Sequence, residues 1–327
     1  MSTILLTGAG GAAIPDLIRH LKGLGHRVLT CDMNSQAPGL YLGDVGFVVP
    51  PATDPDFFYA TLNLCVKRVV DVLIPLVDEE LTAICVTQQL RTTLKLAPNR
   101  QFIKTCLDKW TLMQNLRRMD DVRRPYTSFF TAYEMSLIRY PAIVKPRMGR
   151  GSRGVCVIRN QGELIQNLTD GKLRFSENLI AQEYIEGPEY TVSVVCDQLN
   201  TVHAVVPKEI IRKEGQTWLA VTRKNAKIDT VCRRIAEVLN PCGPFNVQLR
   251  LRDGEPYVFE INPRFSGTVN LTIQAGCDEV GGLIELALGR PYTFGEWREG
   301  VVLVRQTHDM VMDEAEFLGQ APRRWNA

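Results

Sequence analysis

Polar and apolar side chains alternate in the run VFEINPRFSG, residues 258–267. In a β-strand, alternate side chains point to opposite faces. Glu260 and Asn262 would then share one face, while Phe259 and Ile261 face a core. An ordinary half-buried strand gives the same pattern, so the neighbouring residues must decide whether these polar groups do chemistry.

The upstream run FNVQLRL alternates in the same way and carries Gln248 on its polar face. The RDG that follows it is a hairpin turn signal. A two-residue turn at Asp253 and Gly254 would place Gln248 and Glu260 on opposite faces. A three-residue loop, with Gly254 in the left-handed conformation, would place them on one face beside Asn262.

The three-residue loop would bring together three oxygen-bearing side chains with no His or Cys among them, which suits a hard cation such as Mg²⁺. Such an ion keeps several waters and takes further oxygens from the phosphates of a nucleotide. Arg264, which follows the strand-ending Pro263, would lie where a phosphoryl group meets the ion. Since no pair of nucleophile and base is evident in the sequence, these residues favour direct phosphoryl transfer to a substrate oxygen.

A glycine-rich loop follows the strand-like run PAIVKP. Lys145 lies at the end of that run, and Gly149, Gly151 and Gly154 separate it from a second strand-like run. Glycines allow backbone N–H groups to close over an oxyanion, and lysine supplies a point charge for phosphate. The loop is not a P-loop, because the G-K-[ST] ending is absent and a strand follows. A hairpin with a basic, solvated turn is the alternative.

A third candidate is IAQEYIEGPEY, residues 180–190. The strand end QEYI can offer a backbone C=O and N–H to the edge of adenine. Glu189, a few residues later, can accept ribose hydroxyls. A polar hairpin would carry the same residues.

Near the start of the chain, TGAGGAAIPDLIRHL partly matches the dinucleotide-binding fingerprint. Gly8, Gly10 and Ala13 occupy the motif positions, and Asp32 ends the second strand-like run. Pro15 follows at once, and Asp32 alone is weak support. Tight strand-to-helix turns need glycine whatever they bind. A structural turn or a substrate loop is therefore favoured over a nicotinamide or flavin site.

The pattern of expected strands and helices that must position these groups changes along the chain. Residues 1–97 alternate short apolar runs with helical patterns, which predicts a Rossmann-like α/β unit with an open parallel sheet. Residues 98–125 are expected to form a helical linker. Residues 126–197 are expected to form a small α+β lid unit, and residues 198–327 a C-terminal unit that contains the metal strand.

Composition limits the classes of function. A chain of 327 residues is longer than a single hydrophobic core usually supports. Its composition, 45% hydrophobic and 23% charged residues, is ordinary for folded domains. A formal charge of +2 and the lack of a long apolar run imply neither nucleic acid nor a membrane as a partner. Nine cysteines are scattered singly with no C-x-x-C pair, so reduced thiols and a cytoplasmic location are expected.

The glycine-rich loop, the QEYI strand end and the Gln248…E-x-N-P-R pair occur in this order within residues 105–275. In this combination the chain resembles the ATP-grasp superfamily. The sequence motif FNVQ…FEINPRFSG is most similar to the carbamoyl-phosphate synthase large-subunit branch of this superfamily. Residues 1–97 resemble that family's pre-ATP-grasp domain, a Rossmann-like unit that does not bind dinucleotides. The resemblance implies an ATP-grasp fold behind that domain.

The resemblance also implies a role for each motif residue. Lys109 and Lys145 would contact the phosphates of ATP, and Arg264 would stabilise the transferring phosphoryl group. The loop residues that would close over the phosphates are Met148, Gly149, Gly151, Ser152 and Gly154. The residues that would hold adenine and ribose are Gln182, Glu183, Tyr184, Ile185 and Glu189. Gln248, Glu260 and Asn262 would carry one or two Mg²⁺ ions, with Glu260 bridging them and Mn²⁺ able to substitute.

Departures from the family narrow the expected activity. The chain holds one grasp unit instead of the tandem pair of carbamoyl-phosphate synthase, so synthesis of carbamoyl phosphate is not expected. The glycine-rich loop reads GRGSRG and carries two arginines where the family is often richer in glycine. Whether these arginines contact phosphate is therefore left open. Family members with one unit commonly join a carboxylate to an amine through an acyl phosphate. The expected activity is therefore an ATP- and Mg²⁺-dependent ligase that joins a small-molecule carboxylate to an amine, often an amino acid, and releases ADP and phosphate.

Two other functions stay open from the sequence: a nicotinamide-dependent oxidoreductase that uses the first domain, and a nucleotide-binding regulator without turnover. The intact set of motif residues counts against the regulator. Candidate residues of the substrate pocket are Asp78-Glu79, Arg212, Trp218 and Ser266-Gly267. The two acids also fit a helix N-terminus, and Trp218 a packing role. The substrates and the oligomeric state, a homodimer included, are not determined.

Overall fold

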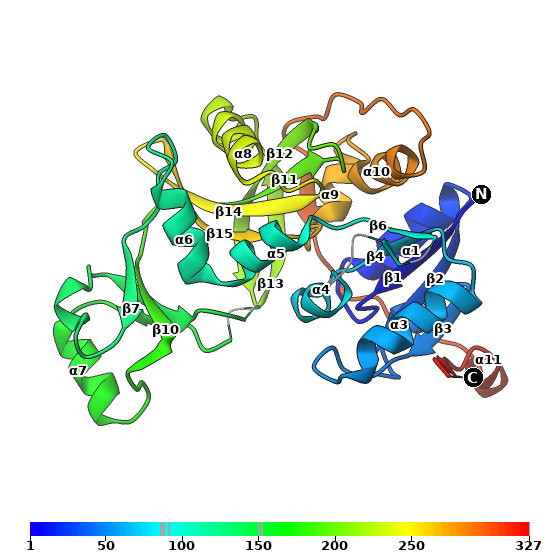
Figure 1. Ribbon diagram of the computed structural model, residues 1–327, viewed down its shortest axis with the longest axis horizontal. Coiled ribbons are helices and arrows are strands. Elements are labelled where there is room, and N and C mark those ends of the chain that lie inside the picture. Colours follow the sequence, from blue (N-terminus) through cyan, green and yellow to red (C-terminus); the bar gives the residue numbers. More distant parts are fainter. Residues whose placement is uncertain (86–88, 91, 150, 152, 327) are drawn as a thin grey trace.

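Three β-sheets follow one another along the long axis of the molecule, with helices packed against them (Figure 1). The structure is a computed structural model that describes residues 1–85, 89–90, 92–149, 151 and 153–326. The N-terminal sheet lies at one end, a small sheet lies at the other, and a six-stranded sheet lies between them.

The N-terminal sheet has the strand order β17-β3-β2-β1-β4-β6-β5. Its strands are β1 (Thr3–Thr7), β2 (Arg27–Asp32), β3 (Val45–Val48), β4 (Val72–Ile74), β5 (Gln89–Leu90), β6 (Thr93–Lys95) and β17 (Arg323–Arg324). Its helices are α1 (Ile14–Gly23), α2 (Gly39–Leu42), α3 (Asp56–Lys67) and α4 (Asp78–Ile84). All neighbouring strands pair in parallel except β5 and β6.

Both faces of the N-terminal sheet are covered, which explains why its strands are continuous apolar runs. Ile4 of β1 packs with Leu17 of α1 on one face. Leu5, the next residue, packs with Phe57 of α3 on the other face. The predicted parallel, Rossmann-like arrangement is confirmed.

The small sheet is antiparallel and has the order β7-β10-β8-β9. Its strands are β7 (Thr127–Phe130), β8 (Ala142–Pro146), β9 (Cys156–Ile158) and β10 (Ser176–Glu183), accompanied by α7 (Gln161–Thr169) and a short 3₁₀ turn at Met135–Leu137. Leu164 of α7 packs with Phe130 and Val144 in a core of its own. The small sheet is therefore stabilised by a core that is separate from those of the other sheets.

The six-stranded sheet has the order β15-β14-β11-β12-β13-β16 and is antiparallel throughout. Its strands are β11 (Glu189–Cys196), β12 (Val202–Glu214), β13 (Gln216–Thr222), β14 (Phe245–Arg252), β15 (Glu255–Asn262) and β16 (Val302–Val304). One face packs on α5 (Arg100–Leu107), α6 (Lys109–Arg117) and α8 (Ala226–Leu239). The other packs on α9 (Val269–Gln274) and α10 (Glu279–Ala287), which also contact α1. These two helices thereby join the N-terminal sheet to the central one.

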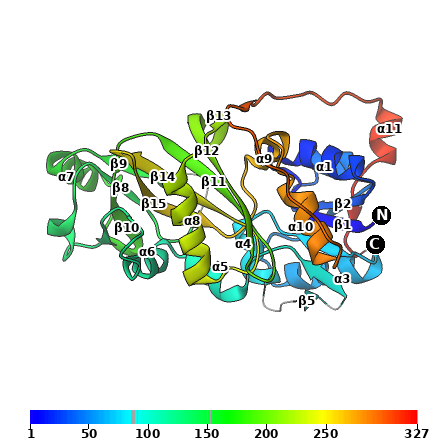
Figure 2. The same cartoon turned by 90° about the horizontal axis from the view of Figure 1, so that it is seen from above.

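Two segments lie outside the units expected for them. β11 falls within the predicted lid unit 126–197, yet it pairs with β12 and β14 and so belongs to the central sheet. The C-terminal segment with α11 (Glu314–Gly319) crosses the molecule to β17, which extends the N-terminal sheet (Figure 2). A strand's pattern shows that it is half-buried but not which sheet it joins, because pairing partners are distant in sequence.

The hairpin between β14 and β15 has the two-residue turn. Arg252 pairs with Glu255, and both Asp253 and Gly254 have positive φ, 54° and 74°. Gln248 nevertheless pairs directly with Glu260, because the register shifts after Leu249. The three-residue loop was therefore not required.

The shift leaves Phe259 as the extra residue of a β-bulge. Val258 and Ile261 are buried in the core, whereas Phe259 lines the cavity described below. The expectation that Phe259 faces the core is wrong for this reason. The bulge turns the end of β15 so that Glu260 and Asn262 leave the core side.

No helix among the described residues combines the length and the apolar character needed to cross a membrane.

Candidate active site

A cavity of about 1080 Å³ runs between the three sheets. The central sheet contributes Gln248 and Glu260, the small sheet contributes Lys145, and the N-terminal sheet contributes the turn around Gly10. One end lies at Ile185 after β10. All three sheets thus supply walls to a single site.

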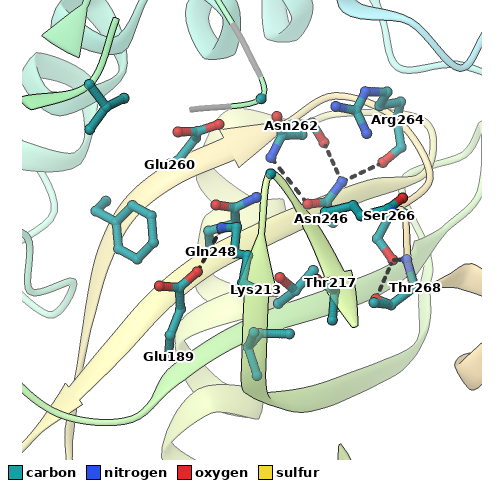
Figure 3. A pocket seen from close by; sticks show the side chains of 18 of the residues that line it. Glu189, Lys213, Thr217, Asn246, Gln248, Glu260, Asn262, Arg264, Ser266 and Thr268 are labelled. Carbon is teal, nitrogen blue, oxygen red and sulfur yellow. Dashed lines mark hydrogen bonds and ion pairs between the residues drawn. The ribbon is translucent and has the colours of Figure 1, made fainter. Parts of the chain in front are cut away.

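The expected metal-binding side chains share one face of the β14–β15 hairpin. Gln248 and Glu260 are direct partners in the ladder, and Asn262 lies two pairs further along, opposite Asn246. In Figure 3 the side chains of Gln248, Glu260 and Asn262 lie next to one another in the cavity. The bulge at Phe259 makes this possible.

Asn246, which the sequence placed on the same face but gave no role, orients Asn262. The Asn262 Nδ2 donates to Asn246 Oδ1 at 3.2 Å, and Asn246 Nδ2 donates to the Arg264 carbonyl at 2.9 Å (Figure 3). This leaves the Asn262 Oδ1 available to a cation. Its position in the FNVQ run was the only signal in the sequence.

The donor set fits Mg²⁺ with a nucleotide. It consists of one carboxylate and two amides, all oxygen donors of the kind that Mg²⁺ takes. Among the residues that the structure describes, no group of three His, Cys, Asp or Glu side chains could hold a metal ion. A single protein carboxylate leaves most of the charge of the ion to be balanced by phosphates.

Two buried lysines line the cavity beside this face. Lys145, at the end of β8, is 5% exposed, and its Nζ lies 5.6 Å from the centre of the Phe259 ring. Burial lowers the pKa of Lys145 to about 8, although the Glu260 carboxylate acts in the opposite direction. Lys109, the first residue of α6, is 6% exposed and donates to the Gly149 carbonyl at 2.6 Å. Both lysines thus lie on the cavity wall, and their contact with the phosphates of ATP stays a prediction.

The glycine-rich loop between β8 and β9 is only partly on the cavity wall. Gly149 and Gly151 line the cavity, and Gly154 is not among the described residues that do. Met148 is exposed and lines a smaller adjoining pocket together with Glu260. Ser152, also predicted here, lies outside the described residues.

The strand end after β10 forms one end of the cavity. Gln182 is 1% exposed and its Nε2 donates to Thr127 Oγ1 at 3.0 Å. The backbone amides of Glu183 and Tyr184 donate to the carbonyls of Tyr126 and Pro141, respectively. Within the described part of the chain, the Ile185 amide has no backbone acceptor.

The turn that follows requires Gly187. Its φ is 123°, and a Cβ there would collide with the carbonyl oxygen of Leu251 in β14. The glycine therefore allows the strand end and the central sheet to approach closely, which closes this end of the cavity.

Glu189, expected to hold ribose, is engaged by two cations. Its carboxylate accepts from Lys213 at 2.8 Å (Figure 3). It also accepts from Arg250 at 2.7 Å. Burial alone would raise the pKa of Glu189, but these two charges hold it below its usual value. The carboxylate is thus ionised and fixed at the cavity wall, where it can still accept a hydroxyl.

Arg264 forms an ion pair that the sequence did not reveal. Its Nε donates to Asp78 Oδ1 at 2.5 Å, across 186 residues of sequence. Asp78 begins α4, so the helix-terminus interpretation of this acid is confirmed, and its role in a substrate pocket stays a prediction. Asp78 and Glu79 line the smaller pocket beside Glu260.

The other candidate substrate residues separate into two groups. Ser266 and Gly267 line the cavity. Arg212 is stacked on Trp218, with 5.3 Å from the guanidinium to the ring centre, and neither is among the described residues of the cavity wall. The stacking of these two side chains on each other in the β12–β13 hairpin accounts for both residues without a substrate.

The glycine turn after β1 opens into this same cavity through Gly8, Gly10 and Gly11. Asp32 does not point freely into it, because its carboxylate accepts the backbone amides of Gly10 and Asn34, each at 2.8 Å. The partial fingerprint therefore forms a turn that faces the cavity, and whether this turn contacts a substrate stays a prediction.

Two family models match the chain. Residues 106–268 match the ATP-grasp domain, and residues 4–95 match the PylC-like N-terminal domain.

Curated relatives are similar over part of their length. The carbamoyl phosphate synthase large chain of Thermomicrobium roseum is 30% identical over 185 residues, which are 51% of this chain and 17% of that protein. The D-alanine–D-alanine ligase of Petrotoga mobilis is 30% identical over 158 residues, 43% of this chain and 52% of that ligase. The chain thus spans less than two thirds of either relative.

Among solved structures, the biotin carboxylase domain dimer of 2-oxoglutarate carboxylase from Hydrogenobacter thermophilus, in complex with MgADP, ADP and bicarbonate, has a TM-score of 0.71. It is 19% identical, and the match covers 92% of this chain and 73% of that chain. At this identity the likeness shows the fold alone. The predicted resemblance is confirmed: the chain carries an ATP-grasp domain, residues 106–268, behind a PylC-like N-terminal domain, residues 4–95.

Proposed function

We propose that this protein is a Mg²⁺- and ATP-dependent ligase that joins a carboxylate to an amine through an acyl phosphate and releases ADP and phosphate. The observation that carries the proposal is the shared face of Gln248, Glu260 and Asn262 in one cavity with Lys109 and Lys145. Oxygen ligands for a hard cation and buried cations for phosphate are the two requirements for handling Mg²⁺-ATP.

The nucleotide would enter with its base at the Ile185 end. The Ile185 amide and the Glu183 carbonyl would meet the edge of adenine, and Glu189 would accept the ribose hydroxyls. Lys145 and Lys109 would bind the phosphates, with Gly149 and Gly151 closing over them. The hairpin face would hold Mg²⁺, and the charge that this ion would supply is the kind that stabilises a transferring phosphoryl group.

Arg264 would stabilise the same charge from the side away from adenine. A positive group fixed in a cavity of low polarity stabilises developing negative charge without reorganising during the reaction. Asp78 fixes the guanidinium of Arg264, so the group is already in place before substrates bind. Catalysis then depends on positioning and charge, with no nucleophilic side chain.

Release of ADP from a panel of carboxylates paired with amines tests the proposal. ADP and phosphate should form only when a carboxylate is present, and hydroxylamine in place of the amine should trap a hydroxamate. AMP among the products, or carboxylate ¹⁸O that never reaches phosphate, would contradict the acyl-phosphate route. The same assay with Mn²⁺ tests whether that ion substitutes for Mg²⁺.

A nicotinamide-dependent oxidoreductase is the alternative that the glycine turn keeps open. Thermal stabilisation by NAD or NADP, and none by Mg²⁺-ATP, would favour it over the ligase. Stabilisation by Mg²⁺-ATP without turnover on any substrate pair would instead favour a nucleotide-binding regulator.

The remaining proposals concern the setting of the enzyme. We propose small molecules as its substrates, no nucleic acid or membrane as a partner, and the cytoplasm as its location, on the basis of the charge and of the scattered cysteines. We also retain the division into 1–97, 98–125, 126–197 and 198–327 as a proposal, with β11 reassigned to the last unit. Sedimentation would decide whether the chain forms a homodimer.

A further inference from the structure

One basic side chain on the cavity wall has no role in the proposed nucleotide site. Arg305 follows β16 and lines the cavity near Ser266 and Gly267. Its Nη2 donates to the Gly267 carbonyl at 2.6 Å, and its backbone amide donates to the Trp218 carbonyl at 2.8 Å. In Figure 3 the Ser266 side of the cavity lies opposite Glu189, away from the expected nucleoside. Arg305 therefore belongs to the substrate end.

The other cavity cations at the two ends are neutralised by protein carboxylates. Lys213 and Arg250 pair with Glu189, and Arg264 pairs with Asp78. Among the residues that the structure describes, no carboxylate forms an ion pair with Arg305. The same holds for Lys109 and Lys145, the lysines expected to bind phosphate.

Arg305 is half-buried, and this burial lowers its pKa although Asp16 acts in the opposite direction. A guanidinium stays charged in proteins, so its partial removal from water is unfavourable unless an anion compensates it. Since the acceptor of its side chain among the described residues is the neutral carbonyl of Gly267, the remaining donors of the fork are available to an anionic ligand.

The site lies close to the expected phosphoryl-transfer centre. Gly267, which Arg305 contacts, is three residues from Arg264, so their Cα atoms are at most about 11 Å apart. Arg264 and Arg305 also line the same cavity, so a small molecule that reacts beside Arg264 has Arg305 on the same wall for a second functional group.

The wall between them is fixed from behind. Lys208, fully buried, donates from Nζ to Ser266 Oγ at 3.2 Å and to Thr272 Oγ1 at 2.7 Å. Ser266 also contacts Thr268, with 2.9 Å between the hydroxyl oxygens (Figure 3). A wall held in this way keeps the Gly267 carbonyl, and with it Arg305, in one position.

We propose that Arg305 binds the α-carboxylate of an amino acid that serves as the amine substrate, an inference that rests on the proposed ligase function. An α-amino acid places its nitrogen next to its carboxylate, so anchoring the carboxylate aims the nitrogen at the acyl phosphate. The attack forms the C–N bond, breaks the C–O bond to phosphate, and passes one amine proton to the departing phosphate.

Binding of amino acids to the MgADP-loaded protein tests this without turnover. Each amino acid of a panel is titrated beside its α-carboxamide, which keeps the side chain and the amine but lacks the negative charge. The wild type should bind at least one amino acid about ten- to a hundredfold more tightly than its amide, the range of a charged hydrogen bond. Arg305→Met should abolish this preference, and Arg305→Lys should restore part of it.

Arg298→Met is the matched control. Arg298 lies in the same C-terminal segment and also donates to a backbone carbonyl, that of Gln274 at 3.0 Å, but it is exposed and away from the described cavity wall. This variant should keep the preference.

Three outcomes would overturn the inference: an Arg305→Met protein that discriminates like the wild type, a wild type that binds the amides equally well, or no binding of any amino acid at millimolar concentration. MgADP titrated alone separates the two proposals. If MgADP binds and amino acids do not, the ligase proposal stands and this one falls. If MgADP does not bind, both fall.

Discussion

The ammonium of Lys145 combines deep burial with a role that needs its charge. Its pKa of about 8 means that the ligand-free protein loses this charge as the pH rises through 8. Bound phosphates favour the charged form and must raise the pKa again. Nucleotide binding between pH 8 and 9 is therefore expected to take up a proton.

This gives a prediction for the pH dependence of binding. The affinity for MgADP should fall as the pH rises from 7 to 9, and Lys145→Met should weaken binding about ten- to a hundredfold at pH 7 while flattening the profile. Calorimetry in buffers of different ionisation enthalpy measures both the affinity and the proton uptake. Lys172→Met, an exposed lysine of the same small sheet unit, is the control. An unchanged slope in Lys145→Met would contradict the assignment.

Glu260 is the one carboxylate of the expected metal face, so its charge should matter more than that of its neighbours. Glu260→Gln keeps the shape but removes the charge, and should lower ADP release by at least about a hundredfold. Asn262→Ala and Gln248→Ala should mainly raise the Mg²⁺ concentration needed. Glu255→Gln, on the same strand but paired with Lys227 on the surface, should leave turnover intact.

A Glu260→Gln enzyme with wild-type turnover at low Mg²⁺ would refute this role. Circular dichroism and the melting temperature of each variant separate loss of the metal site from loss of the fold.

At the level of elements, the hairpin β14–β15 shows which structural features a sequence pattern can predict and which it cannot. The alternation of FNVQLRL and VFEIN predicted both strands and the shared face of Glu260 and Asn262, but it left open whether Gln248 lies on that face. It could not predict the bulge at Phe259, because a bulge depends on the pairing partner and leaves no period of its own. The two-residue turn and the bulge together do what a three-residue loop was expected to do.

A buried polar network couples four other elements. Lys208 of β12 donates to Ser193 of β11 at 2.7 Å, and Ser193 donates to Glu279 of α10 at 2.8 Å. Thr272 of α9 accepts from the same ammonium. Burial lowers the pKa of Lys208 to about 8 and raises that of Glu279, so each group depends on the other for its charge.

The network predicts non-additive stability. Lys208→Met leaves the Glu279 carboxylate buried without its counter-charge and should lower the free energy of unfolding by about 3–5 kcal/mol. Adding Glu279→Gln should recover part of this loss, because the double variant buries no net charge. Urea unfolding of both single variants and of the double one measures the coupling. Losses that simply add would show that the two groups do not act as a pair.

At the scale of the whole molecule, one cavity is shared by parts that are far apart in the sequence. The sequence indicated an N-terminal parallel sheet and an ATP-grasp unit separately, and both are present. It gave no sign that the C-terminal residues return to β3, or that Asp78 of the first domain reaches Arg264. Contacts of this kind arise from the packing of finished domains, which no local pattern encodes.

In the proposed reaction, the Asp78–Arg264 pair would make the N-terminal domain part of the catalytic apparatus, since it fixes the guanidinium expected to stabilise phosphoryl transfer. Asp78→Asn removes the charge that holds Arg264, and should lower ADP release about ten- to a hundredfold while MgADP binding stays unchanged. Asp56→Asn is the matched control, because Asp56 is also the first residue of a helix in this domain but is exposed. If both variants lose activity equally, the effect comes from the helix N-termini. If Asp78→Asn weakens MgADP binding as much as turnover, Asp78 supports the nucleotide site and not Arg264.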